Sequence, residues 1–331
     1  MILTLQHKDY KLLDVMKYVM AIFVVAIHTC PEMSLKSTML REIIEGMYSI
    51  AVPFFFMASG YLLFRKISLP LNRDGEIRML SYLKKICRLY LVWTIIYLPL
   101  TIYGFWMDGI PFFKSVMIFF RNILLVGENF MSWPLWYLLA LIVAVGMIYV
   151  LLKLKLSKSW IIVISTLMAI IGVGLDYCNE NAILQHITDL YFSAFLKTRN
   201  GIFVGFFYVA IGMSLSHKEN LSLPLLLAIG LLGIVGMVIG VPLSSALLVW
   251  AIFVLSISLN CESTNVEIAV KYRLMNSIVY FIHMIWMAFF VLILGLYEGI
   301  MLFCLVLLTS IMSSWWLLRF RDRSIFRLCF N

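Results

Sequence analysis

The chain has 331 residues, of which 63% are hydrophobic and only 13% are charged, and its mean hydropathy is +1.00. A soluble domain of this length needs more charged surface, so the composition excludes a soluble globular protein and predicts an integral membrane protein. The formal net charge of +9 requires no nucleic-acid partner, because basic loops that set membrane topology account for it.

Apolar stretches long enough to cross about 30 Å of hydrocarbon follow one another along the chain. They predict a polytopic all-α protein with a single membrane domain over residues 1–331. About ten transmembrane helices are expected, at residues 12–30, 46–65, 84–104, 134–153, 159–176, 200–217, 221–240, 242–260, 276–296 and 299–318.

Charge placement predicts the orientation of these spans. Most of the 26 Lys and Arg residues lie in loops on the side of the N-terminus, including a basic loop at about 65–88, so both termini are expected in the cytoplasm. The run at about 113–126 carries Lys114 and Arg121 on one face and predicts an interfacial helix rather than a further span. If it crosses instead, the C-terminus changes sides.

The first span, in the stretch "LLDVMKYVMAIFVVAIHTCPE", keeps Asp14, Lys17 and His28 among apolar residues. Lys17 and His28 are eleven residues apart, about 20° beyond three full helical turns, so both lie on one face, with Asp14 nearly on it. Polar side chains inside a membrane helix usually face a cavity or a substrate path, and an imidazole exchanges protons near neutral pH. We therefore expect His28 to be functional. Asp14 and Lys17 have an alternative, in which they pair with each other and Lys17 extends to the headgroups.

Other features inside the predicted spans carry weaker signals. His283, in "IVYFIHMIWM", is read either as a packing residue or as a ligand-binding one. Pro53 is expected to kink the second span, where Ser59 and Gly60 indicate a small-residue helix contact. The glycine run "GLLGIVGMVIG" also indicates helix packing, because nothing around it resembles a phosphate-binding loop.

The six cysteines show no CxxC or CxxH spacing, so no metal site is expected. Cys30 and Cys178 fall on the same predicted side of the membrane. A disulfide between them is therefore one alternative.

Several blocks together resemble the membrane acyltransferase-3 family. "LLDVMKYVMAIFVVAIHT" is similar to its first helix, in which ten residues separate an arginine or lysine from a histidine; many members have arginine where this chain has Lys17. The blocks "VPFFFMASGYLLFRK", "YLKKICRLYLVW", "WPLWYLLALI", "TRNGIFVGFFYVAIG" and "SIVYFIHMIW" resemble later helices, in the family's order, over residues 13 to about 290. Ten helices with both termini inside is also the arrangement that the resemblance implies.

The blocks "TRNGIF" and "VAIHT…VPFFFM" especially resemble the membrane half of the membrane-bound serine racemases of vancomycin-resistance clusters. That half is assigned a role in serine delivery, and those proteins continue into a soluble racemase domain. The sequence here ends after "RFRDRSIFRLCFN". If that is the whole chain, we expect no racemisation.

The resemblance implies a multi-pass protein of the bacterial cytoplasmic membrane. Its implied reaction moves an acyl group, commonly acetyl, from cytoplasmic acyl-CoA to a hydroxyl of an extracytoplasmic envelope saccharide. Acyl transfer to a hydroxyl needs a base, and His28 is the candidate, either as general base or as a nucleophile. Lys17 and Asp14 would line the path of the thioester. Acyl-CoA is the expected donor, with no permanently bound cofactor.

Two groups of residues are candidates for binding. Cations at the cytoplasmic face suit the phosphates of CoA, and the donor candidates are Arg65, Lys84, Lys85 and Arg88, with Ser59. Aromatic faces stack on sugars and a helix start favours anions, so the acceptor candidates are Trp136, Tyr137, Arg199, Asn200 and His283.

A second reading belongs to a different class. A transporter for serine or another small zwitterion would use Asp14, Lys17, His28 and Arg199 as its polar path. No inverted repeat supports that reading, and the basic cytoplasmic cluster favours a donor-binding enzyme. A homodimer stays open.

Overall fold

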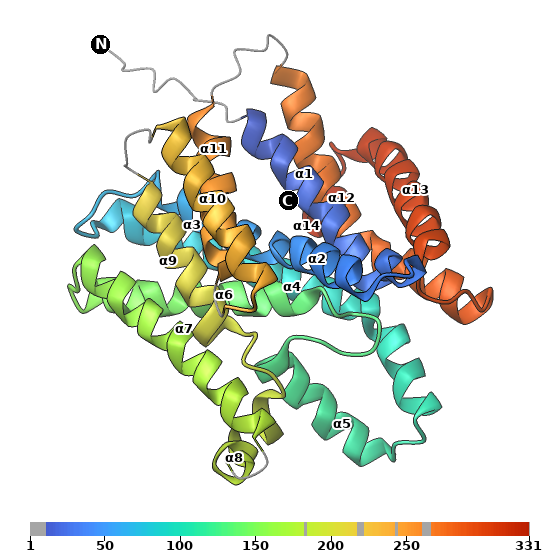
Figure 1. The fold of residues 1–331 in the computed structure, drawn as a ribbon. Coiled ribbons are helices and arrows are strands. Elements are labelled where there is room, and N and C mark those ends of the chain that lie inside the picture. The colour runs from blue at the N-terminus through green and yellow to red at the C-terminus, as the bar shows by residue number, and fades with distance from the viewer. Residues whose placement is uncertain (1–10, 182–183, 217–221, 242–243, 260–265, 331) are drawn as a thin grey trace. The chain divides into compact units, whose positions relative to one another are not determined.

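The computed structural model describes residues 11–181, 184–216, 222–241, 244–259 and 266–330 (Figure 1). Within these ranges every regular element is helical, so the predicted all-α class is confirmed. The expected span boundaries at 217, 221, 242 and 260 lie outside the described residues.

Seven helical segments are long and apolar enough to cross a membrane. They are Leu12–Thr29, Thr38–Phe64, Arg73–Met107, Leu135–Lys153, Lys158–Glu180, Lys271–Ile293 and Ile300–Phe320. Three shorter apolar helices, Gly201–Leu215, Leu223–Val238 and Ser244–Ser258, coincide with the other three predicted spans. Membrane character is therefore supported, while the count of ten and the side of each terminus stay predictions.

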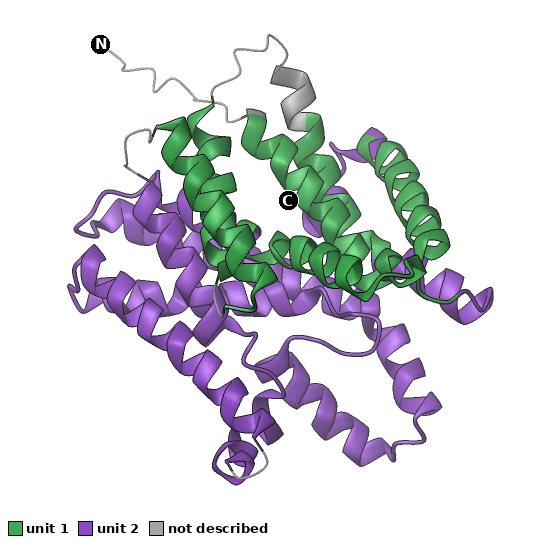
Figure 2. Cartoon of the chain, in the orientation of Figure 1, with its two compact units in different colours: residues 1–54, 219–283, 297–318 green, residues 55–218, 284–296, 319–331 purple. Residues whose placement is uncertain are grey.

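The chain divides into two compact units, coloured separately in Figure 2. Unit 1 comprises residues 1–54, 219–283 and 297–318. Its elements are α1 (Lys11–Thr29), the 3-10 turn η1 (Pro31–Ser34), α2 (Thr38–Ser49), α10 (Leu223–Val238), α11 (Ser244–Ser258), most of α12 (Val266–Ala288) and α13 (Ile300–Leu317).

Inside unit 1, α1 packs on α2, α11 and α13, and α10 packs on α11. The glycine run of α10 makes the last contact close. A Cβ added at Gly233 would lie 2.6 Å from the backbone nitrogen of Leu248, so only glycine permits this approach. The predicted packing role of the run is confirmed.

Unit 2 comprises residues 55–218, 284–296 and 319–331. Its elements are most of α3 (Ala51–Phe64), α4 (Arg73–Met107), α5 (Phe112–Arg121), the π-helical turn η2 (Asn122–Val126), α6 (Leu135–Lys153), α7 (Lys158–Glu180), α8 (Gln185–Phe195), η3 (Gly201–Gly205), α9 (Phe206–Leu215), η4 (Phe289–Ile293) and α14 (Ser324–Phe330). A last 3-10 turn, η5, covers Leu318–Phe320.

Helix α6 lies against α4, η3 and α9, and α7 lies against α8 and α9. Gly60 of α3 approaches the Val209 carbonyl of α9 so closely that a Cβ would collide with it. The predicted small-residue contact at Gly60 is confirmed. Helix α14 returns to α4, where the indole nitrogen of Trp93 donates a hydrogen bond of 2.7 Å to the Cys329 carbonyl.

The predicted second span is two helices rather than one. Helix α2 ends at Ser49 and α3 begins at Ala51, with a break at Ile50. Pro53 has no N–H to donate to the carbonyl four residues earlier, so the predicted kink falls at this break. Because α2 is amphipathic and not continuously apolar, the apolar-run criterion missed its first two turns.

The predicted basic loop at 65–88 is wrong over most of its length, because residues 73–88 form the first half of α4. The side chain of Asn72 caps this helix by accepting a hydrogen bond of 2.8 Å from the Gly75 amide. Asp74 and Glu76 in the first turn complement the helix dipole. These capping signals lie in the sequence and mark the start of the helix.

Helix α5 with η2 occupies the segment predicted as an interfacial helix, and its position relative to a membrane stays a prediction. Cys30 and Cys178 are both free thiols, so the disulfide alternative is wrong. The short helices α8 and α14 were not predicted.

Candidate functional site

An ion-pair cluster joins the N-terminal half of α1 to α12 within unit 1. Arg273 donates hydrogen bonds to the Asp14 carboxylate from two nitrogens, with Nη2 2.7 Å and Nε 3.1 Å from Oδ2. Lys17 Nζ lies 3.6 Å from Oδ1 of the same carboxylate. Asp14 is only 3% exposed, so its charge is buried and satisfied. The predicted pairing of Asp14 with Lys17 is confirmed, but the stronger partner, Arg273, was missed.

Two histidines meet at the other end of the same helix pair. The rings of His28 on α1 and His283 on α12 are stacked, with centroids 5.5 Å apart and planes inclined by 25°. His283 is fully buried, and its Nδ1 lies 3.1 Å from the Val279 carbonyl oxygen. A carbonyl only accepts, so in the neutral ring Nδ1 carries the proton and Nε2 keeps the lone pair.

The lone pair on His283 Nε2 is a buried acceptor, and none of the described residues hydrogen-bonds to it. Burying such an acceptor without a donor costs about 1–3 kcal/mol. A substrate hydroxyl would supply the missing donor. The ligand-binding reading of His283 stays a prediction, and its unpaired nitrogen is the feature that favours it.

Contacts along the two helices also fix their relative direction. Asp14 meets Arg273, Tyr18 meets Tyr272 with ring centroids 5.4 Å apart, and His28 meets His283. From the ion pair to the histidine pair the residue numbers rise on both helices, from 14 to 28 and from 273 to 283, so α1 and α12 run parallel. The ion pair and the histidine pair are about 21 Å apart along α1, from fourteen residues at 1.5 Å each.

In unit 2, α6 brings together candidates that the sequence assigned to different ligands. Ser59 Oγ and Tyr137 Oη are 2.9 Å apart and share a hydrogen bond. The guanidinium of Arg199 lies over the Trp136 ring, 4.8 Å from its centroid, in a cation–π contact. Phe56 also packs edge-on against the Trp136 ring, with centroids 5.9 Å apart, and Trp136 is only 6% exposed, so protein surrounds this ring.

Asn200 has a structural role that the sequence reading did not give it. Its Oδ1 accepts hydrogen bonds from the amides of Ile202 at 2.9 Å and Phe203 at 3.4 Å, and its Nδ2 donates to Tyr191 Oη at 2.6 Å. The free amides expected to attract an anion are thus capped by Asn200 itself, and the expected anion site loses two donors. Burial raises the pKa of Tyr191 to about 12, so the phenol stays protonated.

The basic donor candidates Lys84, Lys85 and Arg88 are exposed on α4 of unit 2, and Arg65 follows the end of α3 in the same unit. Their spacing of three to four residues places Lys84 and Lys85 each beside Arg88 on the helix surface. No group of three or more His, Cys, Asp or Glu residues suited to a metal occurs in the described part of the chain.

Comparison with known proteins gives two kinds of relative. A family model described as "Acyltransferase domain" matches residues 10–319. The chain is also similar to an amino-acid racemase of Enterococcus faecalis, with 28% identity over 205 residues, which are 61% of this chain and 28% of that protein. A serine/alanine racemase of Enterococcus gallinarum is 29% identical over 216 residues, 63% of this chain and 30% of that protein.

The match therefore spans less than a third of the length of these racemases. No solved structure matches the chain.

Proposed function

Because the chain belongs to the membrane acyltransferase-3 family, we propose that it is an integral membrane O-acyltransferase of the bacterial cytoplasmic membrane. It moves an acyl group, acetyl in the simplest case, from cytoplasmic acyl-CoA to a hydroxyl of an extracytoplasmic envelope saccharide. The observation that carries this proposal is the pair of stacked imidazoles, His28 and His283, inside apolar helices of membrane-spanning length.

In this reaction the acceptor hydroxyl attacks the thioester carbonyl. Its proton passes to the His28 imidazole, the carbon–sulfur bond breaks, and the leaving CoA thiolate takes that proton back from the His28 imidazolium. The Nε2 lone pair of His283 accepts a hydrogen bond from a hydroxyl of the same acceptor and holds it against His28. One imidazole moves the proton while the other orients the substrate.

The ion-pair cluster contributes position and charge. The Asp14–Arg273 pair fixes α1 against α12, which sets His28 opposite His283. Among the described side chains two cations face one carboxylate here, which leaves one positive charge in excess. In this proposal Lys17 carries that charge and attracts the anionic donor on its path toward His28.

Donor binding falls to the cations of unit 2. Lys84, Lys85, Arg88 and Arg65 contact the phosphates of CoA, since Lys and Arg bind phosphate through charge-assisted hydrogen bonds. Ser59, which already shares a hydrogen bond with Tyr137, is retained as a donor-side candidate. On the acceptor side, the candidates stay Trp136, Tyr137, Arg199 and Asn200, of which Arg199 already lies over the Trp136 ring.

The test is CoA release from acetyl-CoA by the protein in proteoliposomes supplied with envelope saccharide. His28→Ala should lower the rate about 100- to 10,000-fold, the usual contribution of a general base. Elution of the variant as wild-type protein on gel filtration controls for folding. Transfer near the wild-type rate by His28→Ala would remove the imidazole from the mechanism.

Similarity to the serine/alanine racemase favours a second candidate, recognition or transport of serine. Asp14, Lys17 and His28 would then form the part of the polar path that lies in unit 1. Vesicles carrying the protein would accumulate labelled serine with no dependence on acyl-CoA, whereas the acyltransferase would release CoA only with acceptor present.

A further inference from the structure

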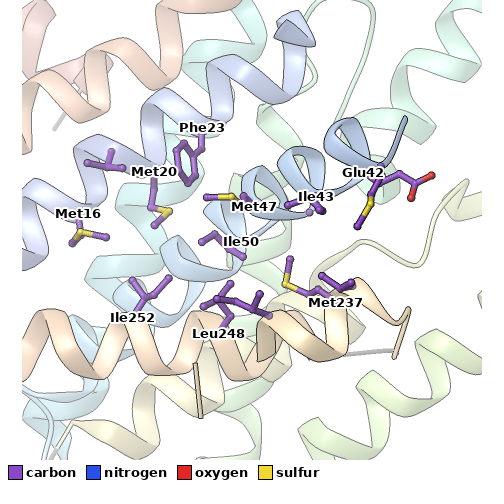
Figure 3. A pocket seen from close by; sticks show the side chains of 15 residues that line it. Met16, Met20, Phe23, Glu42, Ile43, Met47, Ile50, Met237, Leu248 and Ile252 are labelled. Atoms are coloured by element: carbon purple, nitrogen blue, oxygen red, sulfur yellow. The ribbon is translucent and has the colours of Figure 1, made fainter. Parts of the chain in front are cut away.

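Unit 1 contains a cavity of about 430 Å³ that the proposed acyl transfer does not use. Four helices enclose it: α1 and α2 on one side, α10 and α11 on the other (Figure 3). Its volume lies within the range of about 300–1,000 Å³ that is usual for small-ligand sites. All fifteen lining residues belong to unit 1.

The cavity lies on a different face of α1 from the proposed site. Met16, Val19, Met20 and Phe23 line it, and their directions centre about 120° around the helix from the line that joins Lys17 to His28. A molecule bound here would contact α1 without reaching the imidazole pair along the same face. The cavity is therefore a separate site.

The lining chemistry selects hydrocarbon. Fourteen of the fifteen lining residues are apolar or glycine, and the single charged one is Glu42. Five of them are methionines, whose flexible thioethers fit irregular and mobile chains. A hydrated ligand would lose its water in this cavity without gaining hydrogen bonds, whereas methylene groups gain from burial.

The shape and the one carboxylate define the ligand further. Met16 and Glu42 lie at opposite ends of the cavity, so it is elongated and takes a linear chain (Figure 3). Glu42 is exposed at its end, and Glu45 is exposed three residues later on α2. The neighbouring Arg41 is engaged, because its guanidinium donates to the Leu35 carbonyl. Two carboxylates disfavour a phosphate head group and accept hydrogen bonds from hydroxyls.

We propose that this cavity binds one hydrocarbon chain of an uncharged glycolipid, whose sugar hydroxyls donate hydrogen bonds to Glu42. The surrounding bilayer supplies such amphiphiles directly to helices of membrane-spanning character. The proposal goes beyond acyl transfer and does not depend on it, because the ligand is bound and not transformed.

The test uses the full chain in lipid nanodiscs and two probes with a diazirine in one acyl chain. One probe is a monoglucosyl diacylglycerol and the other is phosphatidylglycerol. After irradiation, peptide mass spectrometry should find the glucolipid on α2 and α10 peptides in preference to α13 peptides. Phosphatidylglycerol should label α2 and α10 several-fold less.

Two variants fill the cavity. Met47→Trp changes a residue that is 47% exposed, and Gly46→Leu adds atoms toward the flexible end of Met237, so neither requires backbone movement. Each variant should lower labelling of the α2 and α10 peptides by at least about tenfold, because the larger side chain prevents several methylene groups of the lipid from being buried. Met312→Trp on α13, at a residue that is 69% exposed and outside the cavity, is the matched control and should change nothing.

Glu42→Lys tests the head group and should reverse the preference, so that phosphatidylglycerol labels more strongly than the glucolipid. Labelling that is spread evenly over lipid-facing helices, or that survives both filling variants, would overturn the proposal. Equal labelling of wild-type protein by the two probes would also overturn it. The readout is independent of CoA release, so failure here leaves the proposed function standing, and the reverse also holds.

Discussion

The ion-pair cluster of Asp14, Lys17 and Arg273 predicts which of its side chains stabilises the fold and which serves the reaction. Asp14 is 3% exposed and has two cationic neighbours, of which Arg273 is bidentate and 48% exposed at its side chain, whereas Lys17 stands 3.6 Å away. Asp14→Asn removes the one carboxylate that the described side chains place in this cluster and leaves two cations facing each other. Arg273→Gln leaves Asp14 with Lys17 as its partner. Lys17→Met leaves the bidentate pair intact.

The structure therefore ranks the losses of unfolding free energy. Breaking a buried ion pair costs about 3–5 kcal/mol, while an exposed pair is worth about 0–1 kcal/mol. Asp14→Asn should cost about 3 kcal/mol, and Arg273→Gln about 1–2 kcal/mol because that side chain is half exposed. Lys17→Met should cost under about 1 kcal/mol, because Lys17 Nζ stands 3.6 Å from the carboxylate and its removal leaves Asp14 paired with Arg273. Titration of the micellar protein with sodium dodecyl sulfate, followed by circular dichroism, measures these values.

A double-mutant cycle then completes the assignment. The coupling of Asp14 with Arg273 should exceed that of Asp14 with Lys17 by about 1 kcal/mol or more. Lys17→Met, nearly as stable as wild type, should nonetheless lose CoA release if its charge guides the donor. A larger stability loss from Lys17→Met than from Arg273→Gln would refute the reasoning, and a stable, fully active Lys17→Met would return Lys17 to a structural role.

Three further outcomes follow from single contacts. His283→Phe keeps a ring stacked on His28 and removes a buried acceptor without a partner, so the rate of CoA release should fall about 10- to 100-fold with no loss of stability. His283→Gln restores an acceptor, so its rate of CoA release should fall less; a fully active His283→Phe would contradict this. Arg88→Ala should raise the acetyl-CoA concentration for half-maximal rate about tenfold without changing kcat, and an unchanged requirement would dissociate Arg88 from the donor. Gly60→Leu should lower the free energy of unfolding by at least about 2 kcal/mol, because the new side chain collides with the Val209 carbonyl. Gly146→Leu is the control and should cost little, because a Cβ at Gly146 meets nothing within 4 Å. Equal losses in the same detergent titration would contradict the close approach at Gly60.

The fold was largely predictable because its signal is local. Continuous apolar runs identify α6, α7 and α13, and spacing alone places Asp14, Lys17 and His28 on one face of α1. The same criterion joined the last turn of α2 to α3 and missed the first two turns of α2, because those turns mix charged and apolar residues. It also read the start of α4 as a loop, since charged residues fill the turns after Asn72.

The arrangement of the site was less predictable because its contacts are remote in sequence. Arg273 lies 259 residues from Asp14, and no pattern in one sequence links them. His283 was read as a weak, isolated histidine, and only the structure reveals that it stacks on His28. Asn200 illustrates the reverse error, because a polar residue at a helix start was read as part of an anion site although Asn is a preferred N-cap.

The parallel direction of α1 and α12 bears on the number of spans. Four long apolar helices separate them: Thr38–Phe64, Arg73–Met107, Leu135–Lys153 and Lys158–Glu180. If only long helices crossed the membrane, four intervening crossings would make α12 antiparallel to α1. Parallel helices require an odd number of intervening crossings. If the three shorter apolar helices cross in addition to the four long ones, seven crossings intervene. If only α5 is added to the four long helices, five crossings intervene.

Helix α10 decides between these alternatives. Its 16 residues rise about 24 Å, somewhat less than the hydrocarbon thickness of about 30 Å, so it crosses only with flanking residues or local thinning. Ser222→Cys and Val241→Cys flank it and should react with a membrane-impermeant maleimide from opposite sides of intact cells. Reaction of both from the same side, with Lys114→Cys in α5 shielded from both sides, would mean that α10 does not cross. The odd count would then come from α5, as shielding of Lys114→Cys would indicate, or from one of α9 and α11 alone. Crossing by α5 would reverse the expected side of α6 and α7.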